Sequence, residues 1–342
     1  MAVRDETLIH CQASMLSGTG TCASSIKSQP LLCRLTLCAA ASAEGNVPTK
    51  SSLSHSSQPP PCSLEARIVR VPAGIAVAYM VNLLWESLQA MLKKKIIALA
   101  YEFIEDKVGG MPIIRAMSEI AGSSVLLIAS EYLSTANNGK GVILGGITGV
   151  PPTRVVIIGA GTVAEFAARA ALGLGADVQV FDNHIYKLRR IKHLLGQQIY
   201  TSTIDTVTLG DTLKSADVVI GALRAEKGRA RHVITEEMVT HMKQDSLIID
   251  LSIDQGGCVE TSEITTLSKP VFRRHGVIHY CVPNVASRVA HTAANALSNI
   301  FTPTILRAAE EGGVEAMIFS HKWFMKGVYT YKGGLTNEHV AR

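Results

Sequence analysis

The stretch RVVIIGAGTVA, residues 154–164, decides the fold of this chain. It predicts a buried strand, a glycine-rich turn and the start of a helix, in that order. Gly159 permits the tight turn, Gly161 lets a backbone approach a pyrophosphate closely, and Ala164 lets the helix pack on the strand. The amides of the helix N-terminus, beginning at Thr162, then face an anion. The stretch therefore predicts the phosphate-binding turn of a Rossmann unit.

A second predicted strand ends in Asp182, about twenty residues beyond the turn. A carboxylate there accepts hydrogen bonds from ribose hydroxyls and repels a 2′-phosphate, which favours NAD over NADP. Three alternatives stay open. A glycine turn without a dinucleotide and a SAM-binding enzyme share this layout, and the basic side chains of Lys187, Arg189 and Arg190 leave room for NADP.

Working outward, short apolar runs alternate with helical stretches, the pattern of a parallel α/β sheet. The predicted strands cover residues 154–159, 177–182, 198–202, 217–221, 246–251 and 277–281. A helix over 86–95 and a strand over 96–101 precede them, and long helices are predicted over 115–133 and 286–311, the latter broken near Pro303. The fold class is α/β: a doubly wound parallel Rossmann sheet plus a discontinuous, incomplete second α/β domain.

Four segments follow from this pattern. Residues 1–63 hold twelve serines, a triple proline and three acidic residues, and we expect a disordered or misassigned low-complexity leader. The apolar segment 31–43 resembles a signal sequence, but Arg34 interrupts it and it starts late. We assign 64–135 to the remnant of a substrate domain with a linking helix, 136–285 to the NAD-binding domain, and 286–342 to C-terminal helices that return to the substrate domain.

Composition argues against several classes. The net charge is only +5, and the basic clusters at 93–95 and 187–192 suit solvated helix faces, so we expect no nucleic-acid partner. We find no apolar run of membrane-spanning length and expect no membrane partner. The seven cysteines show no C-x-x-C spacing, which indicates no metal site and a reducing, cytoplasmic setting.

A second constellation follows the apolar run that ends at Asp250. Asp254 and the pair Gly256-Gly257 come just past a predicted strand, where ligands meet the carboxyl edge of an open sheet. Asp254 is therefore placed to meet the nicotinamide end of the cofactor or the substrate, although an ordinary Asp/Gly turn explains the spacing too. A third loop, Val282-Pro283-Asn284, could supply an amide to the same crevice.

Together these motifs resemble the alanine dehydrogenase family, which is related to the NAD(H)-binding subunit of proton-translocating transhydrogenase. The resemblance rests on 159–161, Asp182, 253–258 and 279–284, takes in 100–102, 117–122 and 145–152, and covers roughly residues 86–342. Asp254-Gln255-Gly256-Gly257 favours alanine dehydrogenase over the transhydrogenase subunit.

The resemblance implies reversible, NAD-dependent oxidative deamination of L-alanine to pyruvate and ammonia. It implies a homo-oligomer, a hexamer in much of the family, with Asp254 acting at the reacting centre. The implied cofactor-binding residues are Gly159, Gly161, Thr162, Asp182, Ser118, Ser202, Ala222, Leu223, Ile253, Val282 and Asn284.

The N-terminal region departs from the family pattern. The family places a substrate-binding arginine and lysine and a catalytic histidine there, whereas residues 1–85 do not match, and Met80 falls at the histidine's position. We expect His279 to be a structural strand residue, and we expect the chain to stop short of the family's C-terminus. A catalytically impaired NAD(H)-binding module and a transhydrogenase alpha-subunit-like protein are the alternative functions.

Overall fold

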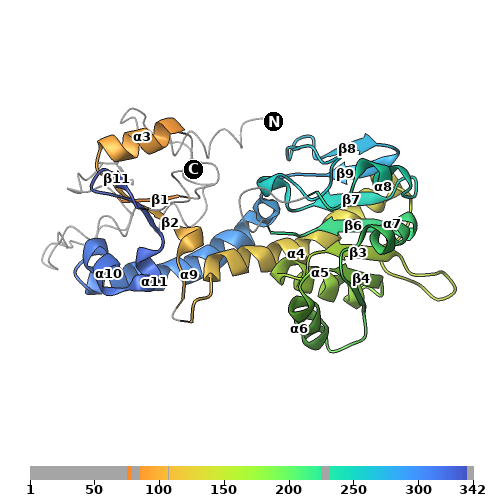
Figure 1. Cartoon of the computed structure of the whole chain (residues 1–342), viewed down its shortest axis with the longest axis horizontal. Coiled ribbons are helices and arrows are strands. Elements are labelled where there is room, and N and C mark those ends of the chain that lie inside the picture. Colours follow the sequence, from red (N-terminus) through yellow and green to blue (C-terminus); the bar gives the residue numbers. More distant parts are fainter. Residues whose placement is uncertain (1–74, 79–84, 107, 225–231, 337–342) are drawn as a thin grey trace, which may run out of the picture. The chain divides into compact units, whose positions relative to one another are not determined.

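The computed structural model describes residues 75–78, 85–106, 108–224 and 232–336 (Figure 1). They belong to two compact units. The Rossmann unit is Ile113–Ala293, and the terminal unit combines the described residues of Met1–Pro112 and Ala294–Arg342. The predicted leader, residues 1–63, lies outside the described residues.

The Rossmann unit is built on a seven-stranded sheet in the order β5-β4-β3-β6-β7-β9-β8 (Figure 1). All neighbouring strands are parallel except β8, which runs antiparallel to β9. The strands are β3 (Arg154–Ile158), β4 (Asp177–Phe181), β5 (Tyr200–Ser202), β6 (Val218–Gly221), β7 (Leu247–Asp250), β8 (Val271–Arg274) and β9 (Val277–Tyr280). This is the Rossmann-like α/β fold that the alternating apolar runs predict.

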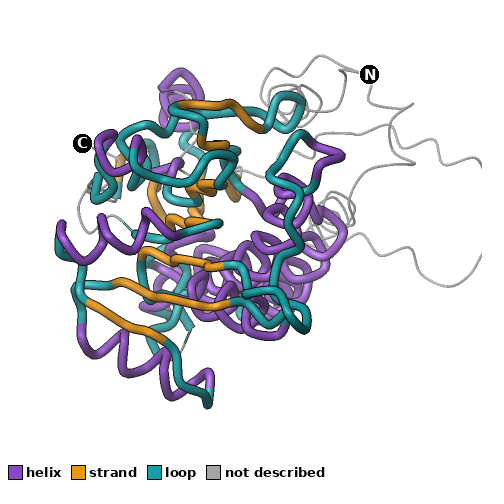
Figure 2. Tube along the Cα trace, turned by 90° about the vertical axis from the view of Figure 1, so that its right-hand side faces the viewer, coloured by secondary structure: helices purple, strands orange, loops and turns teal. Residues whose placement is uncertain are grey.

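Alternate residues of the central strand β3 point to opposite faces of the sheet and belong to different cores. Val155 and Ile157 pack with α4 (Pro112–Leu133), α5 (Thr162–Gly173) and α6 (Ile185–Leu195). Val156 and Ile158 pack with α7 (Thr206–Ser215) and α8 (Glu236–Thr240). Figure 2 shows these helices and the strands of the sheet from a second direction. Burial on both faces explains why the strands are continuous apolar runs rather than alternating ones.

The six predicted strands of this sheet are confirmed to within two residues at each end. The seventh strand, β8, is absent from the sequence prediction. Its sequence VFRR is half-buried to exposed, because β8 is an edge strand with a single neighbour. An edge strand needs no continuous apolar run, so the hydrophobic pattern carried no signal for it.

Helix α4 packs closely on α5 through Gly122, where a Cβ would lie 2.8 Å from the Cβ of Phe166 and also strike the carbonyl of Val163. Among the described residues, α4 is the one helix long and apolar enough to cross a membrane. The expectation that no apolar run reaches that length is therefore wrong. A single such helix is weak evidence for a membrane segment, and Val125, Leu126 and Ala129 of α4 are buried in the protein core.

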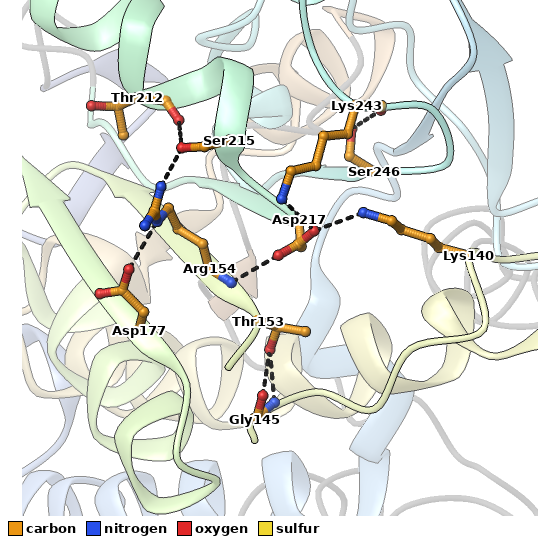
Figure 3. Close-up of polar contacts among 10 residues, drawn as sticks. All are labelled: Lys140, Gly145, Thr153, Arg154, Asp177, Thr212, Ser215, Asp217, Lys243 and Ser246. Carbon is orange, nitrogen blue, oxygen red and sulfur yellow. Dashed lines mark hydrogen bonds and ion pairs between the residues drawn. The ribbon is translucent and has the colours of Figure 1, made fainter. Parts of the chain in front are cut away.

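At the amino ends of the strands, Asp217 joins three segments of the chain (Figure 3). Its Oδ1 accepts hydrogen bonds from the Nζ atoms of Lys140 and Lys243, each at 2.9 Å, and its Oδ2 accepts one from the backbone amide of Arg154 at 2.9 Å. Burial raises the pKa of this carboxyl, but these hydrogen bonds outweigh burial and lower the pKa below its ordinary value. These hydrogen bonds link three chain segments at the amino edge of the sheet, opposite the glycine turn.

The terminal unit contains a four-stranded sheet in the order β1-β2-β10-β11. The strands are β1 (Ile75–Ala78), β2 (Ile97–Ala100), β10 (Val328–Tyr331) and β11 (Gly334–Leu335), and the helices are α3 (Trp85–Lys93), α9 (Ala290–Glu310), α10 (Val314–Ser320) and α11 (Lys322–Met325). Because β10 pairs with β2, segments from before and after the Rossmann unit share one sheet, so this unit is discontinuous, as the predicted fold class has it.

Two details of the C-terminal segment differ from the sequence prediction. It was expected to contain only helices, yet it supplies β10 and β11, whose pairing partner β2 lies far away in sequence. The expected break at Pro303 is also wrong, because α9 continues through it. Four short 3-10 segments complete the described structure: Tyr101–Phe103, Thr135–Asn137, Ile253–Gln255 and Val285–Val289.

Candidate functional site

All but one of the predicted site residues lie at the carboxyl edge of the Rossmann sheet. Because the contributing strands are parallel, the segments that follow them meet along one edge. The glycine turn follows β3, Asp182 follows β4, Ser202 ends β5, Ala222 and Leu223 follow β6, Ile253 and Asp254 follow β7, and Val282 and Asn284 follow β9. The exception is Ser118, which lies on α4.

The conformation of Gly159 is dictated by the protein itself. Its φ is +108°, a region that residues with a Cβ rarely adopt. A Cβ at Gly159 would lie 2.5 Å from the carbonyl oxygen of Ala222, and the Gly159 amide donates to the carbonyl of Phe181 at 2.6 Å. The strand-to-helix turn therefore needs glycine here with or without a ligand.

Gly161 is different, because nothing in the described structure requires a glycine there. Its φ is −84°, an ordinary value, and a Cβ built on it meets no described atom within 4 Å. It is the N-cap of α5 and caps no backbone amide with a side chain, and the first amides of a helix have no partner within that helix. A small residue beside open space and free amides fits the close approach of a pyrophosphate.

Ala160, the middle residue of the turn, is held from both sides. Its amide donates to Oδ2 of the buried Asp182 at 2.8 Å, and its carbonyl accepts from Nη2 of Arg190 at 3.1 Å. Oδ1 of Asp182 also accepts from the backbone amide of His184 at 2.8 Å and lies 3.0 Å from His184 Nδ1. Asp182, predicted to hold a ribose, thus shapes the glycine turn.

From the sequence, Arg190 is expected to lie on a solvated helix face and to leave room for NADP. In the structure its guanidinium contacts the Ala160 carbonyl and lies 3.6 Å from the carboxylate of Glu165, which is buried in the first turn of α5. Little in the sequence indicated this contact, because only tertiary packing brings a cation on this face of α6 to the glycine turn after β3.

A buried carboxylate, Asp250, organises the loop that carries Asp254. Its Oδ2 accepts from the Cys258 amide at 2.9 Å and the Ser262 hydroxyl at 2.8 Å, and its Oδ1 accepts from the Ser252 amide at 3.0 Å. The loop needs Gly257, with a φ of +78°, and the hydroxyl of Ser252 links it to the carbonyl of Leu223 at 2.8 Å. The signal in the sequence was an acidic residue ending a wholly buried strand.

Asp254 lies in the 3-10 segment Ile253–Gln255. The residue is exposed, although neighbouring groups partly shield its carboxyl. The partial burial of its carboxyl raises its pKa, the nearby Asp250 raises it further, and the backbone amide of Asn284 opposes both. Asn284 itself adopts a left-handed conformation, φ 51° and ψ 58°. The loops after β7 and β9 therefore meet at Asp254 and Asn284.

Four further predicted cofactor residues are Ser202, Ile253, Val282 and Ser118. The carbonyl of Ser202 accepts from the Asp182 amide at 3.1 Å, and the side chains of Ile253 and Val282 are buried beside the loops they belong to. Ser118 lies one helical turn before Gly122, the residue of α4 that packs against Val163 in the first turn of α5. Ser118 is therefore about one helical turn away from the contact of α4 with the first turn of α5.

His279 is a structural residue, as predicted. It lies on β9, is fully buried, and its ring hydrogen-bonds with the Thr261 hydroxyl at 2.8 Å and the Val277 carbonyl at 3.1 Å. Burial lowers its pKa to about 4. Burial therefore disfavours the protonated form of this imidazole. Met80, at the position of the family's histidine, lies outside the described residues.

A different histidine contacts the Asp254 loop. Nε2 of the exposed His232 lies 3.2 Å from the carbonyl oxygen of Gly256. Sequence reasoning did not consider it, because the contact joins the loops after two different strands. Within the described ranges, no cluster of three or more His, Cys, Asp or Glu side chains could hold a metal ion.

Comparison with known proteins agrees with this geometry. Residues 125–338 match the family model described as alanine dehydrogenase/PNT, C-terminal domain. Alanine dehydrogenase 2 of Staphylococcus aureus strain USA300 is 39% identical over 254 residues, which cover 74% of this chain and 68% of that protein.

Solved structures show the same relationship. An L-alanine dehydrogenase superposes with a TM-score of 0.74 at 32% identity, over 78% of this chain and 74% of that one. A transhydrogenase from Sinorhizobium meliloti shares the fold, with a TM-score of 0.62 at 21% identity over 78% and 74% of the two chains. The extent of the family match and the identity to these relatives show that this chain belongs to the alanine dehydrogenase/PNT family of oxidoreductases.

Proposed function

We propose that the chain binds NAD at the carboxyl edge of the Rossmann sheet and catalyses the reversible oxidative deamination of L-alanine to pyruvate and ammonia. The observation that carries the cofactor proposal is Gly161: a glycine that the described protein does not require, facing open space at a helix N-terminus. The substrate is proposed from the relatives, whose names specify alanine dehydrogenase.

The residues at the turn suit the adenosine and phosphate portions of the cofactor. The free amides at the start of α5 would hold the pyrophosphate. The Asp182 carboxylate keeps lone pairs beyond its bonds to Ala160 and His184, so it could also accept from a ribose hydroxyl. A carboxylate at Asp182 would repel a 2′-phosphate, and Arg190 contacts the Ala160 carbonyl, so we propose NAD rather than NADP.

Asp254 is the proposed catalytic residue. When bound, NAD supplies the hydride acceptor for the α-carbon of the amino acid. An anionic Asp254 would stabilise the positive charge that develops as the amine becomes an iminium. Its raised pKa also brings the carboxyl closer to the range in which it can take up and release a proton during hydrolysis of that group. The Asn284 amide, which faces Asp254, would keep the carboxylate oriented.

A second candidate function is an NAD(H)-binding module without turnover. The observation in its favour is His279, which is buried and neutral and so does not replace the histidine missing from the family's N-terminal position. A transhydrogenase alpha-subunit-like role is a third candidate, against which the Asp254-Gln255-Gly256-Gly257 sequence argues. We further propose a cytoplasmic homo-oligomer, as in the family.

Two measurements on the full chain test these proposals. The first is a fluorescence titration with NADH, and the second is NADH formation from L-alanine and NAD at saturating cofactor. Binding together with alanine-dependent turnover supports the dehydrogenase. Binding without turnover supports the cofactor module, and absence of binding contradicts both. Hydride exchange between two nucleotides without L-alanine would support the transhydrogenase-like role.

A further inference from the structure

We propose that the ion pair between Glu131 and Arg288 positions the loop carrying Asn284, and so sets the affinity for the nicotinamide half of the cofactor. The inference rests on the proposed binding of NAD. Glu131 Oε2 and Arg288 Nη2 lie 2.7 Å apart although 157 positions separate them in the sequence. Both side chains are partly shielded from solvent, with exposed fractions of 39% and 27%, so screening weakens the pair less than a surface pair.

The loop needs an external anchor because Asn284 is strained. Its left-handed backbone is tolerated by asparagine but disfavoured relative to glycine. A residue in such a conformation persists when its surroundings over-determine it. Within the loop, the Ser287 amide donates to the Asn284 carbonyl at 2.9 Å, and Val282 and Val285 are buried on either side.

Arg288 is the penultimate residue of the short segment Val285–Val289 and anchors it by two contacts. Besides Glu131, its guanidinium lies over the ring of Tyr280, 5.8 Å from the centroid, and Tyr280 packs on Tyr132 with ring centroids 5.8 Å apart. Tyr132 directly follows Glu131 on α4. The end of α4, the end of β9 and the segment after Asn284 are thus joined by one guanidinium. A planar guanidinium can pair with a carboxylate through two donors and lie flat on a ring, a geometry that the compact ammonium of lysine does not reproduce.

The anchor acts on one end of the proposed site. The Asn284 amide faces Asp254, where the nicotinamide and the substrate are expected, whereas the pyrophosphate and adenosine contacts come from Gly161 and Asp182. Loosening the loop should therefore weaken contacts with the nicotinamide half alone. Glu131 and Arg288 are positioning residues in this scheme, since they act through Asn284.

The test compares NADH with ADP-ribose, which lacks the nicotinamide, as ligands of the full chain and of Arg288→Gln, Glu131→Gln and Arg288→Lys. Arg288→Gln and Glu131→Gln should weaken NADH binding about tenfold, the scale of one lost charge-assisted hydrogen bond. Their affinity for ADP-ribose should stay within about twofold of wild type, which lies inside the error of a neutral substitution. Arg288→Lys should fall between, because it restores the charge without the stacking.

The matched control is Arg274→Gln, which removes an arginine of β8 that pairs with Glu263 at 2.9 Å and with Glu236 at 3.5 Å. Arg274 pairs with Val277 at the amino end of β9, away from the proposed site, so the control should bind both ligands as wild type does. Thermal melting of each variant confirms that it is folded, and Glu131→Gln, which keeps the volume of the side chain, guards against misfolding of the arginine variants.

Two results would overturn the inference while leaving NAD binding intact. The first is that the Arg288→Gln and Glu131→Gln variants fold and bind NADH as tightly as the wild type does. The other is an equal loss of affinity for NADH and ADP-ribose, which would indicate a general structural role. If the wild-type chain bound neither ligand, the proposed function would fail and this inference with it.

Discussion

The α-carbon of Gly159 lies so close to the carbonyl of Ala222 that an added Cβ would sit 2.5 Å from its oxygen. The glycine two positions later has no such neighbour, since a Cβ on Gly161 meets no described atom within 4 Å. The two glycines of the turn therefore serve different purposes. The first allows β3 and β6 to approach at their carboxyl ends, and the second borders the open space in which we propose that the pyrophosphate binds.

Alanine substitutions should separate these purposes. Gly161→Ala should keep the wild-type melting temperature within about 2 °C, because neither its φ nor its surroundings oppose a methyl group. It should weaken NADH binding at least about tenfold by occupying the space of the pyrophosphate. Gly159→Ala should instead lower the free energy of unfolding by about 2–4 kcal/mol, because of backbone strain and the clash with Ala222. Urea unfolding and an NADH titration of both variants check this. Normal NADH affinity in Gly161→Ala would contradict the proposed site.

Asp254→Asn should separate binding from chemistry. Because the cofactor is expected to be held by the turn, NADH affinity should change by no more than about twofold, the behaviour of a residue needed only in the transition state. Alanine-dependent NADH formation should be lost. In the wild type, the raised pKa of Asp254 means that activity should fall on acidification at a higher pH than an ordinary aspartate would give, since the charged form stabilises the iminium. A pH profile of turnover, with Asp211→Asn as an exposed control, tests the assignment.

His279 should influence stability rather than turnover. The pKa of the folded imidazole is depressed to about 4 from 6.5, so the unfolded chain binds a proton first as the pH falls. The stabilisation by the neutral ring is complete above pH 6.5 and is lost between 6.5 and about 4. The loss should be at most about 3 kcal/mol. Urea unfolding across this pH range should show a shallower pH dependence in His279→Gln. An identical pH dependence in both proteins would argue against a buried neutral imidazole.

Asp217 should stabilise the opposite edge of the sheet. Its folded pKa is lowered, so its contribution is present above the ordinary value of 3.8 and disappears as the pH falls through the folded value. Asp217→Asn should reduce the free energy of unfolding by about 2 kcal/mol at pH 7, the value of hydrogen bonds to a charged group. Below pH 3.8 the difference from wild type should shrink. NADH affinity should not change, because the network lies at the amino ends of the strands. An affinity loss would show coupling between the two edges.

The elements of the Rossmann unit were predictable because their signals are local. A buried parallel strand is a short run of valine and isoleucine, as in residues 154–158, and the glycine turn that follows it has its own composition. The edge strand β8 and the strands β10 and β11 had no such run, since each is defined by a neighbour distant in sequence or by partial exposure.

The candidate site divides in the same way. The sequence by itself determined which residues end each strand, and a parallel sheet places those ends together, so Gly161, Asp182 and Asp254 could be named in advance. It could not show that Asp182 and Arg190 hold the amide and the carbonyl of Ala160, or that Arg288 pairs with Glu131 across 157 positions. Those contacts depend on how helices pack on the sheet, and a side chain carries no local mark of a partner that only tertiary packing brings within hydrogen-bonding distance.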